Sequence, residues 1–334
     1  MNILKTKIFD KFKPCIPIWF MRQAGRHLPE FRKIRSKNSN FIKLCLNSDL
    51  SSKLTLQPIK RYDLDFAIIF SDILMVPYAL GQHVSFIKNY GPVLSDFNLY
   101  DFLNNNKQTF SKDLKPVYKA ITKTKKKLKK GKKLISFIGA PWTLLIYMMD
   151  LKENGKIKKS KIKNLKNTKI ILDQLNKYLC LHIKNQVKAG ADIIQIFDSW
   201  AGLIPSKDLK RFCYEPNSKL VKFCKSNNIP VICFPKGIKK KYKNFNSIVK
   251  PDGLSLDYEI DPNWAKFNLT NVVLQGGLDP QILFKSEKII YAETKKYLDI
   301  FKDVPYIFNL GHGLDPKTSI SKLKKLIKFV KNYK

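Results

Sequence analysis

Two short apolar runs and the helical stretch between them decide the fold: Leu134-Ile-Ser-Phe-Ile-Gly139, Thr168–Lys188 and Ala191-Asp-Ile-Ile-Gln-Ile-Phe197. The runs are apolar almost throughout, as are strands of a parallel sheet whose two faces are both covered. The stretch between them has the pattern of an amphipathic helix. A strand, a helix and a second strand in succession indicate one unit of an α/β fold with a parallel sheet.

The same succession recurs along the chain. Eight strands are predicted, at 16–21, 66–71, 134–139, 191–197, 230–234, 253–256, 272–276 and 306–310. Helices are predicted between them, among others at 49–61, 115–130, 168–188, 207–226, 286–299 and 318–333. Eight such units predict a (β/α)8 TIM barrel, for which roughly 250 residues is typical. No internal repeat or domain boundary is evident, so residues 1–334 are expected to form a single domain.

An open doubly wound sheet is the main alternative. Its dinucleotide-binding version requires Gly-x-Gly-x-x-Gly after the first strand, and the sequence has no such motif there. The barrel is therefore the favoured fold, and its active site is expected at the C-terminal ends of the strands.

The net charge of the chain is +37. Such a charge is compatible with binding to nucleic acid. However, basic runs such as Lys123–Lys133 and Lys236–Lys243 contain few aromatic residues for base stacking. Lysines are also spread over the whole chain, as codon bias in an AT-rich genome would produce. We therefore expect a solvated surface, with no nucleic-acid partner.

Arginine is rare in this basic chain. Only 6 of the 63 basic residues are arginines, which leaves 57 lysines, and four of the six lie between Arg22 and Arg35. A guanidinium binds a carboxylate or phosphate through two parallel hydrogen bonds, which lysine cannot do. Arg22 and Arg26, on either side of Gly25, therefore predict an anion site, whereas Arg32 and Arg35 fit a solvated helix equally well.

Polar residues follow several of the predicted strands: Asp72, Asp198, Ser199, Lys236, Asp257, Asp279 and His312. Helix caps and turns favour Asp and Ser regardless of function, and Asp279 and Asp315, each before a proline, are expected to be caps. Asp72 differs because apolar residues surround it, so its carboxylate must find partners or change its pKa. His312 lies between two glycines, which let the backbone approach a ligand. The helix after the third predicted strand can direct Tyr147 toward the barrel mouth, although on spacing alone such a tyrosine is more often a core residue than a ligand contact.

The sequence has no signal-peptide pattern, and its longest apolar stretch, at 66–80, is too short to span a bilayer. The six cysteines have neither Cys-x-x-Cys nor His-x-Cys spacing, so neither a zinc site nor a disulfide framework is expected. We expect a cytoplasmic protein with reduced thiols, no metal and no membrane partner.

Several separated motifs resemble the uroporphyrinogen decarboxylase family. The motifs are Pro17-Ile-Trp-Phe-Met-Arg-Gln-Ala-Gly-Arg26, Ile69-Phe-Ser-Asp-Ile-Leu74, Gly139-Ala-Pro-Trp-Thr143, Phe197-Asp-Ser-Trp-Ala-Gly202, Leu274-Gln-Gly-Gly-Leu-Asp-Pro280 and Asn309-Leu-Gly-His-Gly313. The resemblance implies a (β/α)8 barrel, a homodimer with facing sites and no cofactor. It also implies decarboxylation of the four acetate side chains of uroporphyrinogen III, which gives coproporphyrinogen III and four CO2 in heme biosynthesis.

The resemblance also implies roles for individual residues. Asp72 matches the carboxylate that faces the pyrrole N–H groups, and Arg22 and Arg26 match arginines that meet substrate carboxylates. The matching substrate contacts are Gln23, Ala24, Gly25, Tyr147, Ser199 and His312, with Phe197 in the pocket wall. His27 departs from the family, which usually has tyrosine there, and altered hydrogen bonding without loss of function is expected.

The chemistry agrees with these residue types. Protonation of a pyrrole carbon gives a cation that accepts the electrons released with carbon dioxide, so the substrate supplies its own electron sink. Asp72 then stabilises positive charge on the rings, and Asp72 and Arg26 are the expected catalytic residues. The proton donor stays open among Arg26, His312 and Tyr147.

Three alternatives differ in testable ways. A barrel methyltransferase requires zinc-binding His-x-Cys, which the sequence lacks. A Schiff-base lyase would use Lys236, and borohydride would trap its adduct with substrate. An RNA-binding protein would show steeply salt-dependent affinity and no turnover.

Overall fold

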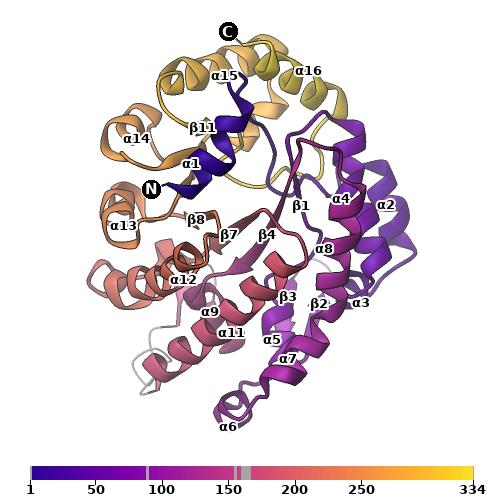
Figure 1. Cartoon of the computed structure of the whole chain (residues 1–334), viewed down its shortest axis with the longest axis vertical. Coiled ribbons are helices and arrows are strands. Elements are labelled where there is room, and N and C mark those ends of the chain that lie inside the picture. Colours follow the sequence, from indigo (N-terminus) through magenta and orange to yellow (C-terminus); the bar gives the residue numbers. More distant parts are fainter. Residues whose placement is uncertain (1, 88–89, 154–155, 159–166, 334) are drawn as a thin grey trace.

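The computed structural model describes residues 2–87, 90–153, 156–158 and 167–333. Seven parallel strands form one curled sheet in the order β1-β4-β7-β8-β9-β10-β11 (Figure 1). These strands are β1 (Phe66–Ile68), β4 (Lys133–Gly139), β7 (Ile193–Asp198), β8 (Val231–Pro235), β9 (Gly253–Leu256), β10 (Val273–Gly276) and β11 (Tyr306–Ile307). All of them match predicted strands, and the α/β barrel class is confirmed.

The helices surround the sheet on its outer side, apart from α1 (Ile3–Lys7), which crosses one end of the barrel (Figure 1). Those in the first half are α1 (Ile3–Lys7), α2 (Pro29–Ser36), α3 (Phe41–Cys45), α4 (Ser48–Arg61), α5 (Met75–Ala79), α6 (Leu99–Leu103), α7 (Lys107–Asp113), α8 (Lys115–Lys127) and α9 (Pro141–Met148). Those in the second half are α11 (Thr168–Lys188), α12 (Glu215–Ser226), α13 (Tyr242–Val249), α14 (Pro262–Asn268), α15 (Glu287–Phe301) and α16 (Ile320–Lys331). The α11 helix has the predicted bounds, whereas the stretch predicted at 207–226 contains a π-helical turn, Lys210–Tyr214, before α12.

Two short antiparallel hairpins lie outside the barrel sheet. One consists of β2 (Val84–Ile87) and β3 (Gly91–Leu94), and the other of β5 (Lys152–Glu153) and β6 (Lys156–Ile157). The second hairpin follows α9 and carries Lys152 toward the barrel mouth, where its side chain contacts Trp200.

The predicted first strand at 16–21 is wrong as a regular strand, because only a single bridge, Ile18 to Phe308, forms there. The Ile18 N–H donates to the Asp65 side chain at 2.9 Å, which replaces a ladder bond to a backbone carbonyl. The segment nevertheless closes the barrel. It bonds to the β11 side through Phe308 N–H to Pro17 O, at 2.9 Å, and to the β1 side through Asp65 N–H to Ile18 O, at 3.0 Å.

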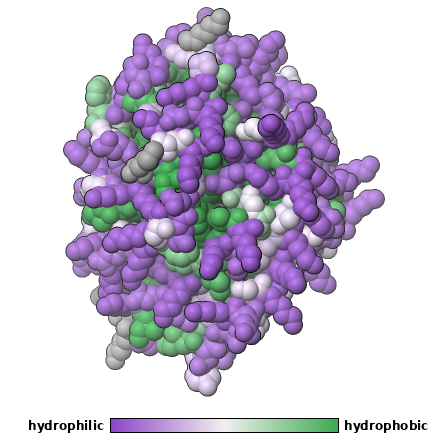
Figure 2. Space-filling view, viewed as in Figure 1, coloured by the Kyte–Doolittle hydropathy of each residue, from purple (hydrophilic) through white to green (hydrophobic). Residues whose placement is uncertain are grey.

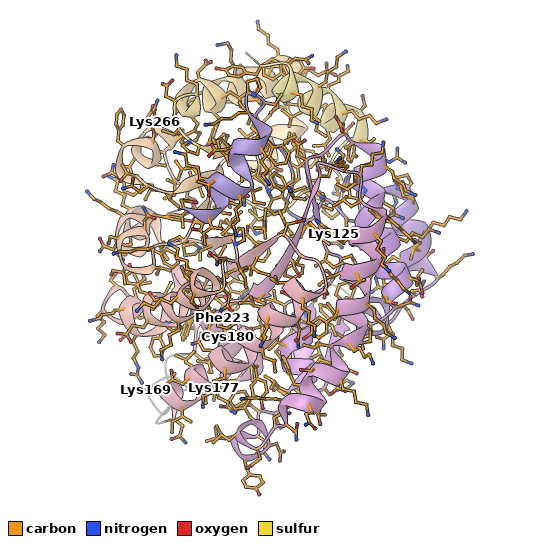
Figure 3. The ribbon with its side chains drawn as sticks, in the orientation of Figure 1. Lys125, Lys169, Lys177, Cys180, Phe223 and Lys266 are labelled. Carbon is orange, nitrogen blue, oxygen red and sulfur yellow. The ribbon has the colours of Figure 1, made fainter. Side chains whose placement is uncertain are left out.

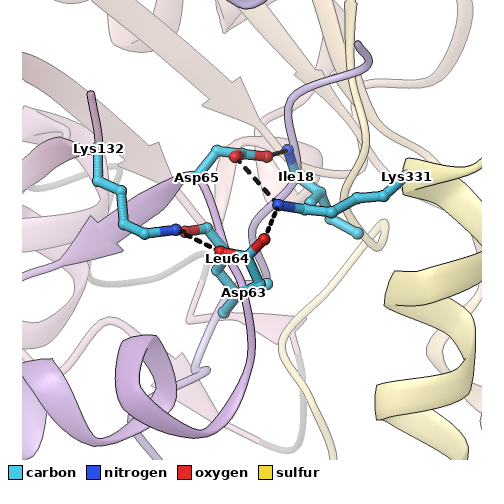
Figure 4. Close-up of polar contacts among 6 residues, drawn as sticks. All are labelled: Ile18, Asp63, Leu64, Asp65, Lys132 and Lys331. Carbon is cyan, nitrogen blue, oxygen red and sulfur yellow. Dashed lines mark hydrogen bonds and ion pairs between the residues drawn. The ribbon is translucent and has the colours of Figure 1, made fainter. Parts of the chain in front are cut away.

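An ion-pair network reinforces this closure (Figure 4). Lys331 Nζ of α16 lies 2.8 Å from Asp63 and 3.4 Å from Asp65. Lys132 Nζ bonds the other Asp63 oxygen at 2.8 Å and the Leu64 carbonyl at 2.6 Å. The two lysines lower the pKa of Asp63 to about 2 by hydrogen bonding. The seam between the two ends of the barrel therefore contains both backbone and charged contacts.

The inside of the barrel is packed. Side chains from the strands form one apolar cluster with Leu4, Ile8 and Phe9 of the N-terminal segment, and α1 crosses this end of the barrel (Figure 1). A polar layer lies among them, in which Trp19 Nε1 donates to Gln275 at 2.9 Å and Gln275 donates to Ser255 at 2.6 Å. The N-terminal end of the barrel is thus filled, and the opposite end carries the partly exposed polar residues.

Hydrophilic residues cover most of the face in Figure 2, with an apolar area near its centre. Lysines lie on helices all around the barrel; Lys169 and Lys177 of α11 are exposed, and Lys266 lies on α14 (Figure 3). Lys125 of α8 instead pairs with Asp192 at 2.7 Å (Figure 3). Among the described residues, no helix is long and apolar enough to cross a membrane.

Candidate active site

Asp72 lies in the turn that follows β1, at the C-terminal end of the barrel. Its Oδ1 accepts a hydrogen bond from the Leu74 N–H at 2.8 Å, so the residue does initiate a turn. Its Oδ2 accepts no hydrogen bond from the described residues, and the side chain is partly exposed. Surrounding protein raises the pKa of Asp72 to about 6, although the Leu74 N–H and the Arg22 charge oppose this rise. A second carboxylate oxygen therefore stays available to a ligand.

Arg22 is held in a strained backbone conformation beside Asp72. Its φ of 61° lies in the left-handed region, which costs energy for any residue but glycine. The neighbouring Met21 is fixed on two sides, since its N–H donates to Asn309 Oδ1 at 3.1 Å and its carbonyl accepts from the Leu314 N–H at 2.9 Å. The loop that carries His312 thus fixes the position of Arg22.

The Arg22 side chain passes over Gly313. A Cβ at Gly313 would lie only 2.4 Å from Arg22 Cδ, so glycine is needed for this close approach. At Gly311 an added Cβ would lie 2.4 Å from the backbone nitrogen of Tyr258, which cannot move aside. Both glycines around His312 are therefore explained by close packing against the protein itself, and the approach of this backbone to a ligand stays a prediction.

The rest of the N-terminal motif divides into buried and exposed residues. Gln23 is fully buried, with Oε1 accepting from the Phe20 N–H at 3.0 Å and Nε2 donating to the Phe66 carbonyl at 2.9 Å. Ala24 and Gly25 are half-buried in the turn, and a Cβ at Gly25 would lie 2.5 Å from the Arg22 carbonyl. Arg26 is exposed; its guanidinium forms no ion pair or hydrogen bond within the described ranges. The structure therefore groups Arg22, but not the Arg26 side chain, with Asp72.

Tyr147 of α9 joins the group from the next strand unit. Its ring contacts Trp200 edge-on, with centroids 6.2 Å apart. Burial raises the pKa of Tyr147, Asp72 raises it further and Arg22 lowers it, which places the three side chains near one another. The core position that the sequence left open is thus replaced by a half-buried one at the barrel mouth.

Ser199 and Phe197 come from the end of β7. Ser199 is half-buried in the turn, and its hydroxyl forms no hydrogen bond with the part of the chain that the structure describes. Phe197 is also half-buried and packs edge-on against Phe137 and Phe234, with centroid distances of 5.7 and 6.3 Å. These residues give the mouth an aromatic wall beside a free hydroxyl.

His312 is half-buried and faces positive charge. Burial lowers its pKa to about 4, and the nearby charges of Lys236 and Arg22 lower it as well. The imidazole is therefore neutral at neutral pH. A bound anion that offsets these two charges would raise its pKa again.

Lys236 follows β8 and belongs to this same cluster. Burial lowers its pKa, Asp257 and Glu259 raise it, and Arg22 and Lys152 lower it again. Lys152 Nζ lies 3.8 Å above the Trp200 ring. Nothing in the sequence distinguishes Lys152 from the other lysines, and only the chain's path through α9 and β5 brings it here.

Other acidic residues at strand ends have structural roles. Asp198 is buried and accepts from Thr143 Oγ1 at 2.8 Å and from Asn217 Nδ2 at 3.1 Å. Asp257 accepts from the Gly237 N–H at 2.7 Å. Asp279 and Asp315 each accept from a backbone N–H two residues on. Asp279 is the N-cap of the short helix Pro280–Phe284, as predicted, whereas Asp315 stabilises a turn and is not the cap of a described helix.

His27, where the resemblance would give tyrosine, lies outside the group. It is buried, stacks on Tyr62 with centroids 6.2 Å apart, and burial lowers its pKa to about 4. Any change in hydrogen bonding that His27 causes would therefore lie in the packed region behind the Arg22–Arg26 turn.

Two surface hollows lie elsewhere. One of about 270 Å³ is lined by residues of α4 and α16, and one of about 480 Å³ lies near α1, at the opposite end of the barrel. Among the described residues, no group of three or more His, Cys, Asp and Glu side chains could hold a metal ion. The described arrangement is therefore one carboxylate, one arginine, two lysines, a tyrosine, a serine and a neutral histidine at the barrel mouth.

Comparisons with known proteins match the whole chain. The family model "Uroporphyrinogen decarboxylase (URO-D)" matches residues 5–333. A uroporphyrinogen decarboxylase of Orientia tsutsugamushi (strain Ikeda) is 41% identical over 324 residues, which are 95% of this chain and 94% of that protein. One of Rickettsia bellii is 40% identical and covers 95% of each chain.

Solved structures show the fold. A methyltransferase from Methanosarcina mazei has a TM-score of 0.77 at 19% identity and covers 98% of both chains. A B12-independent methionine synthase from a Shewanella species has a TM-score of 0.55 at 11% identity and covers 85% of both chains. At these identities the likeness concerns the barrel alone.

Proposed function

This chain belongs to the uroporphyrinogen decarboxylase family, and from that premise we propose how its barrel mouth carries out the reaction. The protein decarboxylates the four acetate side chains of uroporphyrinogen III to give coproporphyrinogen III in heme biosynthesis. The roles of individual residues are the proposal. Its main support is that the Arg22 side chain passes over Gly313, next to His312, and that the charges of Asp72 and Arg22 act on Tyr147 at the same end of the barrel.

Each decarboxylation needs one proton in total. Protonation of a ring carbon gives a cationic ring, and the electron pair of the breaking C–C bond neutralises this cation as carbon dioxide leaves. The exocyclic carbon then takes a proton to become a methyl group, and the ring carbon returns its own proton. The net change replaces one carboxylate and one proton by carbon dioxide and one new C–H bond.

Asp72 stabilises the cationic ring. With a pKa of about 6 its carboxylate is ionised at neutral pH, and Oδ2 is available to accept pyrrole N–H hydrogen bonds. Because Oδ1 is fixed by the Leu74 N–H, the carboxylate is oriented before the substrate binds. Such preorganised charge costs little reorganisation as positive charge develops on the rings.

Arg22 binds substrate carboxylates, with Arg26 reaching the same substrate from the exposed side of the turn. Phe197 packs against the tetrapyrrole, and Ser199 offers it a hydroxyl. Gln23 supports the site indirectly, since both ends of its side chain hold the barrel seam. Ala24 and Gly25 allow the turn to approach the substrate closely.

His312 delivers protons once the substrate is bound. In the free protein Lys236 and Arg22 help to keep it neutral. Substrate carboxylates offset those charges, so its pKa rises and the imidazole can take up and return a proton. Tyr147, which burial keeps protonated, donates a hydrogen bond beside it.

We further propose that the chain is one domain, that it works in the cytoplasm without a nucleic-acid partner, and that it forms a homodimer with facing sites. Tyr258 after β9 and Phe284 after β10 are 42% and 43% exposed at the end of the barrel that carries the site. Exposed apolar side chains around this end support an interface there. Light scattering on the purified protein measures the oligomeric state.

An anaerobic assay with uroporphyrinogen III tests the function, with the carboxyl number of each product measured over time. We expect products that descend from eight to four carboxylates. Asp72→Ala should abolish turnover without preventing folding, whereas Asp96→Ala, at an exposed position, should leave it unchanged. An active Asp72→Ala protein would rule out the role of this carboxylate.

A further inference from the structure

Lys236 and Lys152 form a second cationic group at the barrel mouth, on the side of β7 and β8. Lys236 follows β8, and its carbonyl accepts from the Gly202 N–H at 2.8 Å, two residues after Trp200 in the chain. Lys152 Nζ of β5 lies 3.8 Å from the centre of the Trp200 ring. The charges of Arg22 and Lys152 both lower the pKa of Lys236. Three cations therefore line the barrel mouth, Arg22 on the first barrel segment and the two lysines beside β7 and β8, with Asp257 and Glu259 as nearby carboxylates.

Asp257 and Glu259 act on Lys236 through their charge, but neither forms an ion pair with it. Asp257 Oδ2 accepts from the Gly237 N–H at 2.7 Å and from the Tyr242 hydroxyl at 3.2 Å, and Oδ1 accepts from the Glu259 N–H at 3.1 Å. Lys236 forms no ion pair with any residue that the structure describes. Burial of an unpaired ammonium group is energetically unfavourable. An anionic ligand that pairs with the half-buried Lys236 would offset this cost.

Trp200 fixes Lys152 at the same place. The backbone N–H of Trp200 donates to Thr143 Oγ1 at 3.2 Å, and the backbone carbonyl of Trp200 accepts from Trp142 Nε1 at 3.0 Å. Its ring also contacts Tyr147. A cation over a tryptophan face is attracted by the negative face of the ring. Lys152 is thus directed toward the mouth and not left to move freely in solvent.

We infer that Lys236 and Lys152 bind substrate carboxylates opposite Arg22. This inference rests on the proposed function, because it concerns the octacarboxylate substrate of that same site. The substrate carries carboxylates around its whole rim, so cations on one side alone would leave the other side unpaired. With Arg22 on the first barrel segment and the two lysines near β7 and β8, the ring is held from two sides over Asp72.

The arrangement predicts selectivity among ligands. Coproporphyrinogen carries four carboxylates and uroporphyrinogen eight, so loss of one cation should weaken the binding of uroporphyrinogen more. The lysines therefore assist retention of partly decarboxylated intermediates and release of the final product.

The test uses Lys236→Gln and Lys152→Gln in the full-length protein, with Lys240→Gln and Lys156→Gln as exposed controls. In the anaerobic assay we expect Lys236→Gln to raise KM for uroporphyrinogen about fivefold or more and Lys152→Gln about threefold, with kcat changed less than twofold. Lys236→Arg should restore KM to within about threefold of wild type, since it keeps the charge. The control variants should match wild type.

The outcomes separate this inference from the proposed function. If the wild type does not turn over uroporphyrinogen, the proposed function fails. If the wild type is active and both glutamine variants keep its KM, the two lysines do not bind substrate. If Lys236→Gln lowers kcat and leaves KM unchanged, the lysine takes part in the chemical step and the inference is wrong. If Lys236→Gln does not fold, Lys152→Gln decides.

Discussion

Replacing Asp72 by asparagine should stabilise the protein while removing its activity. Protein around the carboxylate raises its pKa to about 6, against about 3.9 for a free aspartate. The folded protein therefore holds this proton more tightly than the unfolded chain does. Above about pH 6 the ionised carboxylate lowers the free energy of unfolding by its full amount. This destabilisation is lost as the pH falls toward about 4, where both the folded protein and the unfolded chain hold the proton.

The size of the effect follows from the pKa difference. A difference of about 2 units corresponds to about 3 kcal/mol, and partial exposure of the side chain lowers the expected value to about 1–3 kcal/mol. Asparagine keeps an oxygen that accepts the Leu74 N–H, so the turn is preserved. It lacks the negative charge that stabilises the cationic ring, and loss of such a charge lowers kcat by about 10²–10³.

Urea unfolding of wild type and Asp72→Asn at several pH values provides the assay. We expect the variant to be more stable at pH 7, with the difference closing toward pH 4. We also expect kcat/KM of the wild type to fall below about pH 6, because this ratio reports ionisation of the free protein. Asp198→Asn is the matched control, because Asp198 has a similarly raised pKa but both its oxygens accept hydrogen bonds, so an amide there should destabilise. A less stable or fully active Asp72→Asn protein would refute this reasoning.

Three further changes test the surroundings of the site. Arg22→Lys should raise KM for uroporphyrinogen about tenfold in the anaerobic assay despite the conserved charge, since lysine lacks the planar fork; an unchanged KM would argue against carboxylate binding there. Gly313→Ala should displace Arg22 and lower kcat/KM about tenfold with little change in urea midpoint, whereas Gly311→Ala, which meets backbone, should mainly lower the midpoint. Asp63→Asn should lower the free energy of unfolding at pH 7 by at most about 1 kcal/mol, because the Asp63 side chain is 74% exposed. This difference from wild type should narrow as the pH falls from 4 toward 2, where Asp63 itself becomes protonated. A difference that persists at low pH would mean that its charge is not what holds the seam.

Sequence patterns predicted the barrel strands because these are short, apolar and separated by amphipathic helices. The strand at Gly253–Leu256 and the helix at Thr168–Lys188 have the predicted bounds. The prediction of a first strand at 16–21 was wrong because the Ile18 N–H donates to the Asp65 side chain and not to a backbone carbonyl of a neighbouring strand. Pairing through a side chain leaves no periodic signal in the sequence.

Part of the site could also be predicted, where the residues next to a side chain in the sequence single it out. Asp72 and His312 stood out because their neighbours are unusual for such residues, and both lie at the barrel mouth. Gln23 was expected at the substrate, yet its amide bonds two backbone groups of the barrel seam. The position of Lys152 at the site could not be predicted from the sequence. It depends on the hairpin after α9 and on contact with Trp200, which lies far from Lys152 in the sequence.

A crystal structure with coproporphyrinogen bound, prepared anaerobically, tests the central claim most directly. We expect pyrrole N–H groups at about 2.8–3.0 Å from Asp72 Oδ2, with peripheral carboxylates at Arg22 on one side and at Lys236 on the other. A tetrapyrrole bound elsewhere, or bound at the barrel mouth without an N–H contact to Asp72, would contradict the account.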